Sequence, residues 1–265
     1  MKPARFRGYP APMSPRSVLF SALLALASAP LAVASDAGTP SAGVVPGIAA
    51  MVDAGLLSRL QAQAPRLDPQ VLGLALDAAG CAAASGRVAP PRRLAVIDYS
   101  RPSTEPRLWV FDLREARLLH AEHVAHGRRS GENFATAFSN RDSSHQTSLG
   151  LFATAETYVG GNGYSLRMDG LEPGINDRAR DRAIVMHGAP YVDPVMAQRQ
   201  GRLGRSLGCP AVRPAVAQEV IDTLKGGQLL FAYYPDRQWL ANSRFFRCRA
   251  GLAAQGGASR PAGGR

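Results

Sequence analysis

The chain has 265 residues and a net charge of +11, with 46% hydrophobic and 19% charged residues. This composition is typical of a globular protein of one or two domains and excludes a disordered chain. The 27 glycines and 20 prolines indicate many turns and favour a β-rich domain over a helical bundle. The chain has no nucleic-acid motif and no Lys/Arg block interleaved with aromatic residues, so we expect no nucleic acid among its partners.

Residues 1–34 have the organisation of a secretory signal peptide. A basic leader precedes the uncharged run VLFSALLALASAP, and residues 32–34 (AVA) offer a small-x-small cleavage site. The alternative is a membrane anchor, but the apolar core is short for a bilayer span. We therefore expect export and cleavage without a permanent membrane anchor. The leader carries four basic and no acidic residues, so cleavage lowers the net charge from +11 to +7.

The next segments predict a linker and a pair of helices. Residues 35–48 are small and rich in Gly and Pro, which is typical of a linker. Residues 49–84 show helical spacing of apolar residues. Asp68 and Pro69 interrupt this pattern as an N-cap followed by Pro at the first helical position. We expect a helical hairpin at 49–84, ahead of the main domain.

Residues 92–248 are expected to form the main domain, which is mainly β. Short β-branched and aromatic runs predict seven strands, at 93–100, 107–113, 116–126, 149–154, 164–170, 183–188 and 228–234. Residues 214–227 predict one helix before the last strand, with Pro214 at its start and glycines at its end. The Gly/Ala/Arg-rich tail at 249–265 is expected to be disordered.

The segment GRSLGCPAVRP, residues 204–214, places one of only three cysteines in a stretch built like a tight turn. Cys209 precedes the expected helix, where a helix N-terminus and nearby positive charge favour a thiolate. Gly208 allows a substrate backbone to approach closely, and Pro210 stiffens the turn. Taken alone, this pattern favours a structural or disulfide-bonded cysteine over a nucleophile.

A nucleophilic thiol needs a base, and two histidines at the ends of expected strands are candidates. His187 ends the apolar run AIVMHG and His126 occurs in HVAHG, each directly before a glycine. Sequence spacing alone does not choose between them. The other three histidines lack metal-ligand spacing such as H-E-x-x-H, so we expect no zinc peptidase.

Two motifs together resemble those of a known family. MHGAPYV (186–192) and GRSLGCPAV (204–212) are similar to the histidine and cysteine motifs of the bacterial murein L,D-transpeptidase catalytic domain, which has a His-Gly pair followed by Ser-x-Gly-Cys. The similarity covers about residues 92–236 and is greatest for the branch with Pro after the cysteine. The resemblance implies a β-sandwich or barrel-like catalytic domain in the periplasm or at the cell wall.

The resemblance also implies a mechanism, that of a cysteine acyltransferase. Cys209 attacks a peptidoglycan tetrapeptide stem, releases D-alanine and passes the acyl group from a thioester to an amine of a neighbouring stem. His187 is the base, oriented by a backbone carbonyl such as that of Gly188. Backbone N–H groups near Gly208 and Cys209 stabilise the oxyanion. No metal or cofactor is required.

The remaining candidate site residues are assigned less directly. Ser206 either hydrogen-bonds within the site or only shapes the turn. The family commonly has Arg two residues beyond the cysteine, where this chain has Ala211, so Arg205 or Arg213 is expected to bind substrate. Two further residues are expected to line the cleft and its wall: His126 and Tyr191.

Other interpretations of the same motifs stay open. Water in place of the amine makes an L,D-carboxypeptidase. A non-catalytic cell-wall-binding module suits the basic charge, but the presence of both His187 and Cys209 in their motif contexts argues against it. Papain-like peptidases usually have cysteine before histidine, and sortases share the order found here but not the Gly-Cys-Pro context.

The three cysteines allow one disulfide if Cys209 stays free, namely Cys81–Cys248. These two cysteines flank the catalytic domain, and the ends of a domain often lie close together. We expect this disulfide. The alternative is two separate thiols, with Cys81 a small buried residue among alanines.

Overall fold

The computed structural model describes residues 54–246 and 248. The expected signal peptide (1–34), linker (35–48) and tail (249–265) lie outside the described residues, as does the start of the expected hairpin at 49–53. Within the described ranges, no helix has the length and apolar character needed to cross a membrane.

The expected helical hairpin consists of α1 (Ala54–Gln63) and α2 (Pro69–Ala84). Asp68 caps α2, because its side chain accepts a hydrogen bond from the Gln70 N–H at 2.7 Å, and Pro69 occupies the first turn. The alanine- and leucine-rich face of α2 is buried against β1 and β8 of the sheet. The N-cap predicted from the sequence is therefore confirmed, and the hairpin packs on the sheet.

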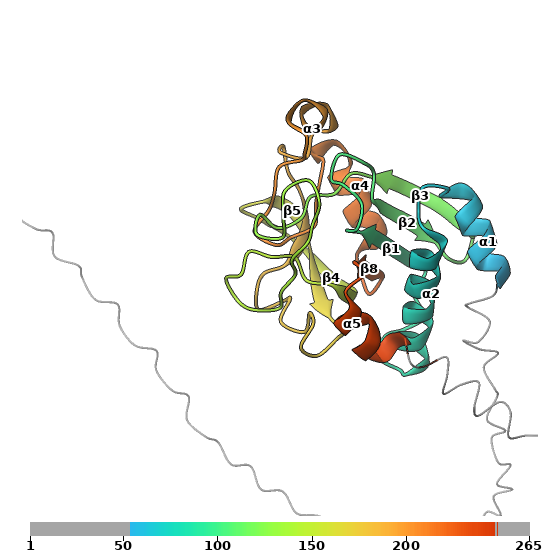
Figure 1. Cartoon of the computed structure of the whole chain (residues 1–265). Helices are drawn as coiled ribbons and strands as arrows, with labels where there is room; N and C mark the ends of the chain where they lie inside the picture. The colour runs from blue at the N-terminus through green and yellow to red at the C-terminus, as the bar shows by residue number, and fades with distance from the viewer. Residues whose placement is uncertain (1–53, 247, 249–265) are drawn as a thin grey trace, which may run out of the picture. The chain divides into compact units, whose positions relative to one another are not determined.

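Eight strands form one sheet, so the fold is mainly β, as expected (Figure 1). The strands are β1 (Arg93–Asp98), β2 (Leu108–Asp112), β3 (Arg117–Glu122), β4 (Gly150–Gly160), β5 (Gly163–Gly170), β6 (Val185–Gly188), β7 (Ala211–Val212) and β8 (Leu229–Tyr233). Their order is β3-β2-β1-β8-β4-β5-β6-β7. The β1–β8 and β6–β7 pairs are parallel and the others are antiparallel.

All seven expected strands are present, with shifted ends. β4 runs on to Gly160 and turns into β5 at Gly163, whose φ of 73° suits a glycine in the turn. β6 begins only at Val185, because Ala183 has a left-handed φ of 52°. β3 ends at Glu122, earlier than expected. The two-residue strand β7, which the sequence analysis did not predict, pairs with β6 directly after the cysteine motif.

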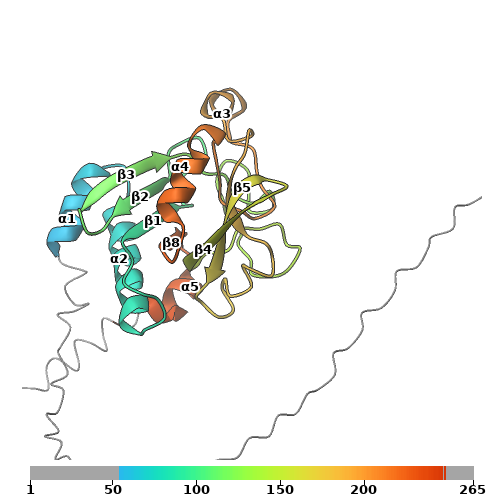
Figure 2. The ribbon, with the colours of Figure 1, turned by 180° about the vertical axis from the view of Figure 1, so that it is seen from behind.

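Helices cover the sheet and connect its strands. The expected helix before the last strand is α4 (Pro214–Leu224), which buries Ala217, Val220, Ile221 and Leu224 and packs against β1, β5 and β6 (Figure 2). The shorter helices are α3 (Pro194–Gln200), α5 (Arg237–Asn242) and the 3-10 helix η2 (Arg244–Phe246). The arrangement leaves β6 and β7 at one edge of the sheet, and the cysteine motif lies along that edge.

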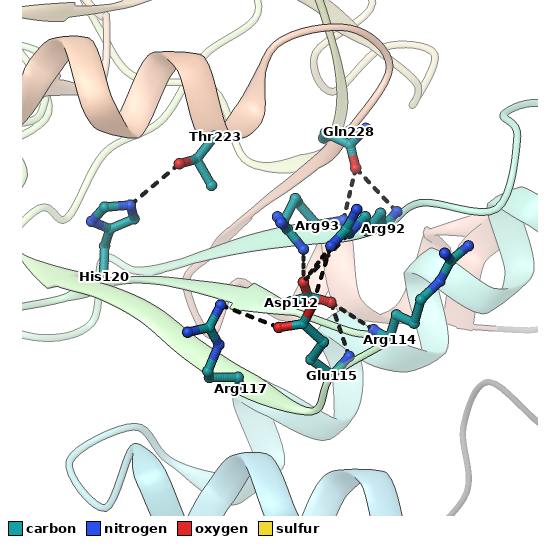
Figure 3. A network of polar contacts seen from close by, with 9 residues as sticks. All are labelled: Arg92, Arg93, Asp112, Arg114, Glu115, Arg117, His120, Thr223 and Gln228. Carbon is teal, nitrogen blue, oxygen red and sulfur yellow. Dashed lines mark hydrogen bonds and ion pairs between the residues drawn. The ribbon is translucent and has the colours of Figure 1, made fainter.

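A polar network joins the start of β1 to the end of β2, which lie side by side in the sheet (Figure 3). The buried Asp112 carboxylate pairs with Arg93 and accepts hydrogen bonds from the N–H groups of Arg114 and Glu115 at 2.9 and 3.0 Å. Gln228 Oε1 accepts from the Arg93 N–H at 2.7 Å and so joins the start of β8 to β1. These contacts satisfy a buried carboxylate and hold the parallel β1–β8 pair in register.

The expected disulfide is confirmed. Cys81 of α2 is bonded to Cys248, with 5.7 Å between the two Cα atoms. The bond ties α2 to the segment after η2, and α2 and η2 also pack together. Cys209 is the free cysteine of the described chain.

Candidate active site

Cys209 and His187 come from neighbouring segments at the β6–β7 edge. β6 and β7 pair in parallel with His187 opposite Ala211, two residues after Cys209. Cys209 Sγ accepts a hydrogen bond from the Val185 N–H at 3.5 Å and donates to the Ala183 carbonyl at 3.6 Å. The thiol is therefore held at the start of β6, and the imidazole lies near the end of the same short strand.

The imidazole of His187 is oriented by the backbone. Nδ1 lies 3.0 Å from the Gly188 carbonyl, which can only accept, so Nδ1 carries the proton. Nε2 makes no hydrogen bond within the described part of the chain and is left with a free lone pair. The side chain is buried, and this burial lowers the pKa of His187, opposed by the hydrogen bond to Gly188. At neutral pH the group is a neutral imidazole, which is the form that a general base requires.

The thiol of Cys209 is 8% exposed. Burial raises its pKa, while the Val185 N–H and the Arg182 charge act in the opposite direction. In the described structure Sγ makes no hydrogen bond to His187. Burial therefore favours the neutral thiol and the neutral imidazole in this structure.

Ser206 braces the turn that carries Cys209. Its Oγ donates to the Cys209 carbonyl at 2.7 Å and accepts from the Gly208 N–H at 3.0 Å. Gly208 has a φ of 127°, and a Cβ there would lie 2.9 Å from the Gln146 carbonyl oxygen, so glycine is required. Because Ser206 occupies the Gly208 N–H, that group does not serve as the expected oxyanion donor in this conformation, whereas the Cys209 N–H donates to no other described residue.

His126 is not part of the cleft, contrary to expectation. It is 1% exposed, and both ring nitrogens are used. Nδ1 accepts from the buried guanidinium of Arg107 at 2.7 Å, and Nε2 donates to the Gly131 carbonyl at 3.3 Å. Burial and the Arg107 charge lower the pKa of His126 to about 3. Its backbone carbonyl accepts a hydrogen bond from the Ser206 N–H at 3.0 Å, so His126 stabilises the turn that carries Cys209.

The two arginines expected to bind substrate both have carboxylate partners. Arg205 pairs with Glu132 at 2.6 Å, and Arg213 donates to both oxygens of Glu122 at 2.8 Å. Each guanidinium thus has a carboxylate partner within the protein, and Glu132 is shared between Arg205 and Arg202. Tyr191 is 37% exposed, and burial of its hydroxyl, followed by the Cys209 charge, raises its pKa to about 12. Its role as a wall residue stays a prediction.

Two residues near the thiol were not found from the sequence. Thr147 donates to the Gly208 carbonyl at 3.3 Å and accepts from the Gly127 N–H at 2.9 Å, which links three segments at the turn. Arg182 precedes Ala183, the residue whose carbonyl accepts from the thiol. The position of Arg182 in DRAIVMHG, five residues before His187, is the sequence signal that could have indicated it.

Among the described residues, no group of His, Cys, Asp and Glu side chains could hold a metal ion.

The mainly β fold and the neighbouring segments that carry Cys209 and His187 can be compared with known families. The family profile for the L,D-transpeptidase catalytic domain matches residues 63–233. The match spans more than half of the chain, which therefore belongs to this family. The resemblance recognised in the two motifs is confirmed.

Solved structures similar to the chain include three bacterial proteins. An L,D-transpeptidase from Mycobacterium smegmatis is 15% identical over 54% of this chain and 59% of that chain, with a TM-score of 0.34. Mycobacterium tuberculosis L,D-transpeptidase 1 is 13% identical over 54% and 62%, with a TM-score of 0.31. Bdellovibrio bacteriovorus Bd1075 is 17% identical over 63% and 56%, with a TM-score of 0.36. The chain thus spans about three fifths of the length of these proteins, and no curated protein matches it in sequence.

Proposed function

We propose that the chain is a peptidoglycan L,D-transpeptidase, a cysteine acyltransferase with Cys209 as the nucleophile and His187 as the base. One observation carries the assignment. The free Nε2 of a neutral, backbone-oriented imidazole lies on the same four-residue strand that holds the buried thiol at its start. A nucleophilic thiol needs such a base, and the other candidate, His126, has no free nitrogen.

The proposed reaction combines this geometry with the chemistry that the family resemblance implies. His187 Nε2 takes the proton of Sγ as the sulfur attacks the carbonyl carbon of the third stem residue, at its L-centre. The oxyanion that forms accepts from the Cys209 N–H. The bond to D-alanine breaks, and its amine leaves with the proton from the imidazolium. The amine of a second stem then attacks the thioester and loses a proton to His187, and the thiolate departs and is reprotonated.

The disulfide and the expected signal peptide favour a location outside the cytoplasm. The Cys81–Cys248 disulfide supports folding in an oxidising compartment, in line with the signal peptide expected at residues 1–34. We therefore propose peptidoglycan stem peptides as the partner and the periplasm or cell wall as the location. Neither step of the reaction calls for a metal or cofactor.

The test is incubation of the protein without residues 1–34 with tetrapeptide-containing muropeptides, followed by mass spectrometry. The proposal expects crosslinked dimers and released D-alanine with the wild type, and neither with Cys209→Ala. Tripeptide without dimer would instead assign an L,D-carboxypeptidase. Unchanged muropeptides bound by the protein would assign a wall-binding module and overturn the proposal.

A further inference from the structure

Arg182 is a half-buried cation beside the cysteine turn, bound only by uncharged oxygens. Its guanidinium donates to the Ser139 carbonyl at 2.7 Å, Ser144 Oγ at 3.1 Å, the Gln146 carbonyl at 2.7 Å and Ser148 Oγ. Its Nε is buried and has no hydrogen-bond partner within the described part of the chain. Such a set of contacts holds the guanidinium in place but leaves its charge unbalanced.

The other arginines near the site differ in this respect. Arg205 and Arg213 each have a carboxylate within 3 Å, in Glu132 and Glu122. Among the described residues, no carboxylate lies within ion-pair distance of Arg182. Removing part of a charge from water without a counter-ion is costly, so an anion that forms near this half-buried cation is stabilised by it.

Two neighbours of Arg182 link it to the turn that carries Cys209. The Gln146 carbonyl, which accepts from Arg182, lies 2.9 Å from where a Cβ on Gly208 would be. Ala183, the residue after Arg182, turns its carbonyl to the Cys209 thiol and has a left-handed φ of 52°. A non-glycine residue in this conformation is strained, and such strain persists where the surroundings require it. Two peptide groups thus connect the guanidinium to the cysteine turn.

We propose that Arg182 is the counter-ion of the Cys209 thiolate, a positioning residue that balances the negative charge created when His187 removes the thiol proton. This proposal deepens the proposed function and rests on the nucleophilic role that it gives to Cys209. Only the proton of Sγ moves, to His187 Nε2, while the guanidinium stays charged. Arg182 therefore stabilises the nucleophile without touching the substrate.

The charged and titratable groups around the pair are consistent with this role. Besides Arg182, Tyr99 and Tyr191 interact electrostatically with the thiol. His187 lies on β6 two residues after Val185, whose N–H contacts the thiol. The groups that act on Arg182, besides Cys209, are Asp142 and Arg178. Burial lowers the pKa of Arg182, and Asp142 and then Cys209 raise it. Among the described side chains that act electrostatically on the thiol, Arg182 is the one that stays positively charged across the pH range of the test.

The test measures thiolate reactivity and needs no peptidoglycan. Iodoacetamide alkylates Cys209 when its thiolate forms an S–C bond and iodide leaves, and Cys81 and Cys248 are protected by their disulfide. The rate is followed from pH 6 to pH 10 by mass spectrometry. We expect Arg182→Gln to react about tenfold more slowly at pH 7, with a profile displaced about one unit upward. Arg182→Lys, which keeps the charge, should stay within about threefold of the wild type.

A matched control separates local charge from net charge. Arg180 lies two residues away, is exposed, and pairs with Glu156 and Asp169 on the surface. Arg180→Gln removes the same formal charge and should leave the alkylation profile unchanged. Equal slowing in Arg180→Gln and Arg182→Gln would assign the effect to net charge and overturn the proposal.

A second pair of variants keeps Arg182 in place, in case its replacement prevents folding. Ser144→Asp gives the guanidinium a competing carboxylate at an existing hydrogen-bond position. Ser143→Asp adds the same charge on the adjacent exposed residue. We expect slower alkylation at pH 7 only in Ser144→Asp.

The outcomes are distinct. An unchanged rate in Ser144→Asp or in folded Arg182→Gln overturns the proposal, as does equal slowing in Arg182→Lys and Arg182→Gln, because the hydrogen bonds rather than the charge would then matter. If the alkylation experiments overturn the role of Arg182, the result of the muropeptide assay is unaffected, and the proposed function stands or falls on that assay. Conversely, a chain that alters no muropeptide can still show the alkylation pattern.

Discussion

The Cys209 thiol donates its hydrogen bond to the Ala183 carbonyl, 3.6 Å away, and not to the His187 ring. Burial disfavours the charged forms of both side chains, since it raises the pKa of the cysteine and lowers that of the histidine. Under the proposed function, this geometry favours general-base activation upon substrate binding over a preformed thiolate–imidazolium pair. This distinction has consequences for mutation and for pH.

Replacement of the thiol should abolish the chemistry and spare the fold. Cys209→Ala is expected to give no detectable muropeptide turnover, because the atom that forms the thioester is absent, while circular dichroism stays that of the wild type. A carbapenem, which by family resemblance acylates such cysteines, should add its full mass to the wild type only. Turnover retained in the variant, or an adduct on it, would remove Cys209 from the mechanism.

The two buried histidines should respond differently to truncation. His187→Ala is expected to lower kcat about 100-fold or more through the loss of the general base. His126→Ala should instead lower the free energy of unfolding by about 2–3 kcal/mol, because Arg107 loses a buried acceptor. Steady-state kinetics and urea unfolding of both variants measure this. Similar losses of activity at wild-type stability in both would refute the division of roles.

The acid limb of the pH–rate profile should lie below pH 6.5. The base must be neutral, and burial lowers the pKa of His187 from its ordinary value of 6.5. The value of kcat/KM should therefore persist as the pH falls to 6.5 and decrease only at lower pH. An acid limb centred above 6.5 would mean that the imidazole is more exposed or faces an anion in solution.

Stability should fall with acid through His126. Its pKa is about 3 in the folded protein, against about 6.5 when unfolded, so the unfolded state binds one more proton between these values. This contribution to the free energy of unfolding is complete above pH 6.5 and is lost as the pH falls toward 3. At pH 5 the loss amounts to about 2 kcal/mol. His187 and His123 act in the same direction, since burial also lowers the pKa of each. Unfolding experiments should show a shallower pH dependence in His126→Gln; an identical slope would contradict the assignment.

The disulfide should be measurable as one free thiol. Thiol counting on unfolded, unreduced protein is expected to find Cys209 alone, and three thiols after reduction. Removing the bond in Cys81→Ala/Cys248→Ala should lower the free energy of unfolding by up to about 5 kcal/mol, since the bond closes a loop of 167 residues. Three thiols before reduction would exclude the bond in solution.

Local sequence determined much of this fold. The N-cap at Asp68 and the start of α4 at Pro214 follow from a few adjacent residues, because capping and the fixed φ of proline act within one turn. The seven expected strands are short β-branched runs between turn residues, and all occur. The family, too, was evident from the two motifs at 186–192 and 204–212. Signals of this kind need no knowledge of what lies opposite each residue.

The tertiary structure decided the division of labour among residues that look alike in sequence. His126 and His187 both precede a glycine, and only the buried guanidinium of Arg107 makes one of them structural. Arg205 and Arg213 were both expected to bind substrate, and the structure adds that Glu132 and Glu122 pair with them. Strand β7 exists because β6 lies alongside it. Desolvation, ion pairing and ladder hydrogen bonds depend on neighbours distant in the chain, which local patterns do not encode.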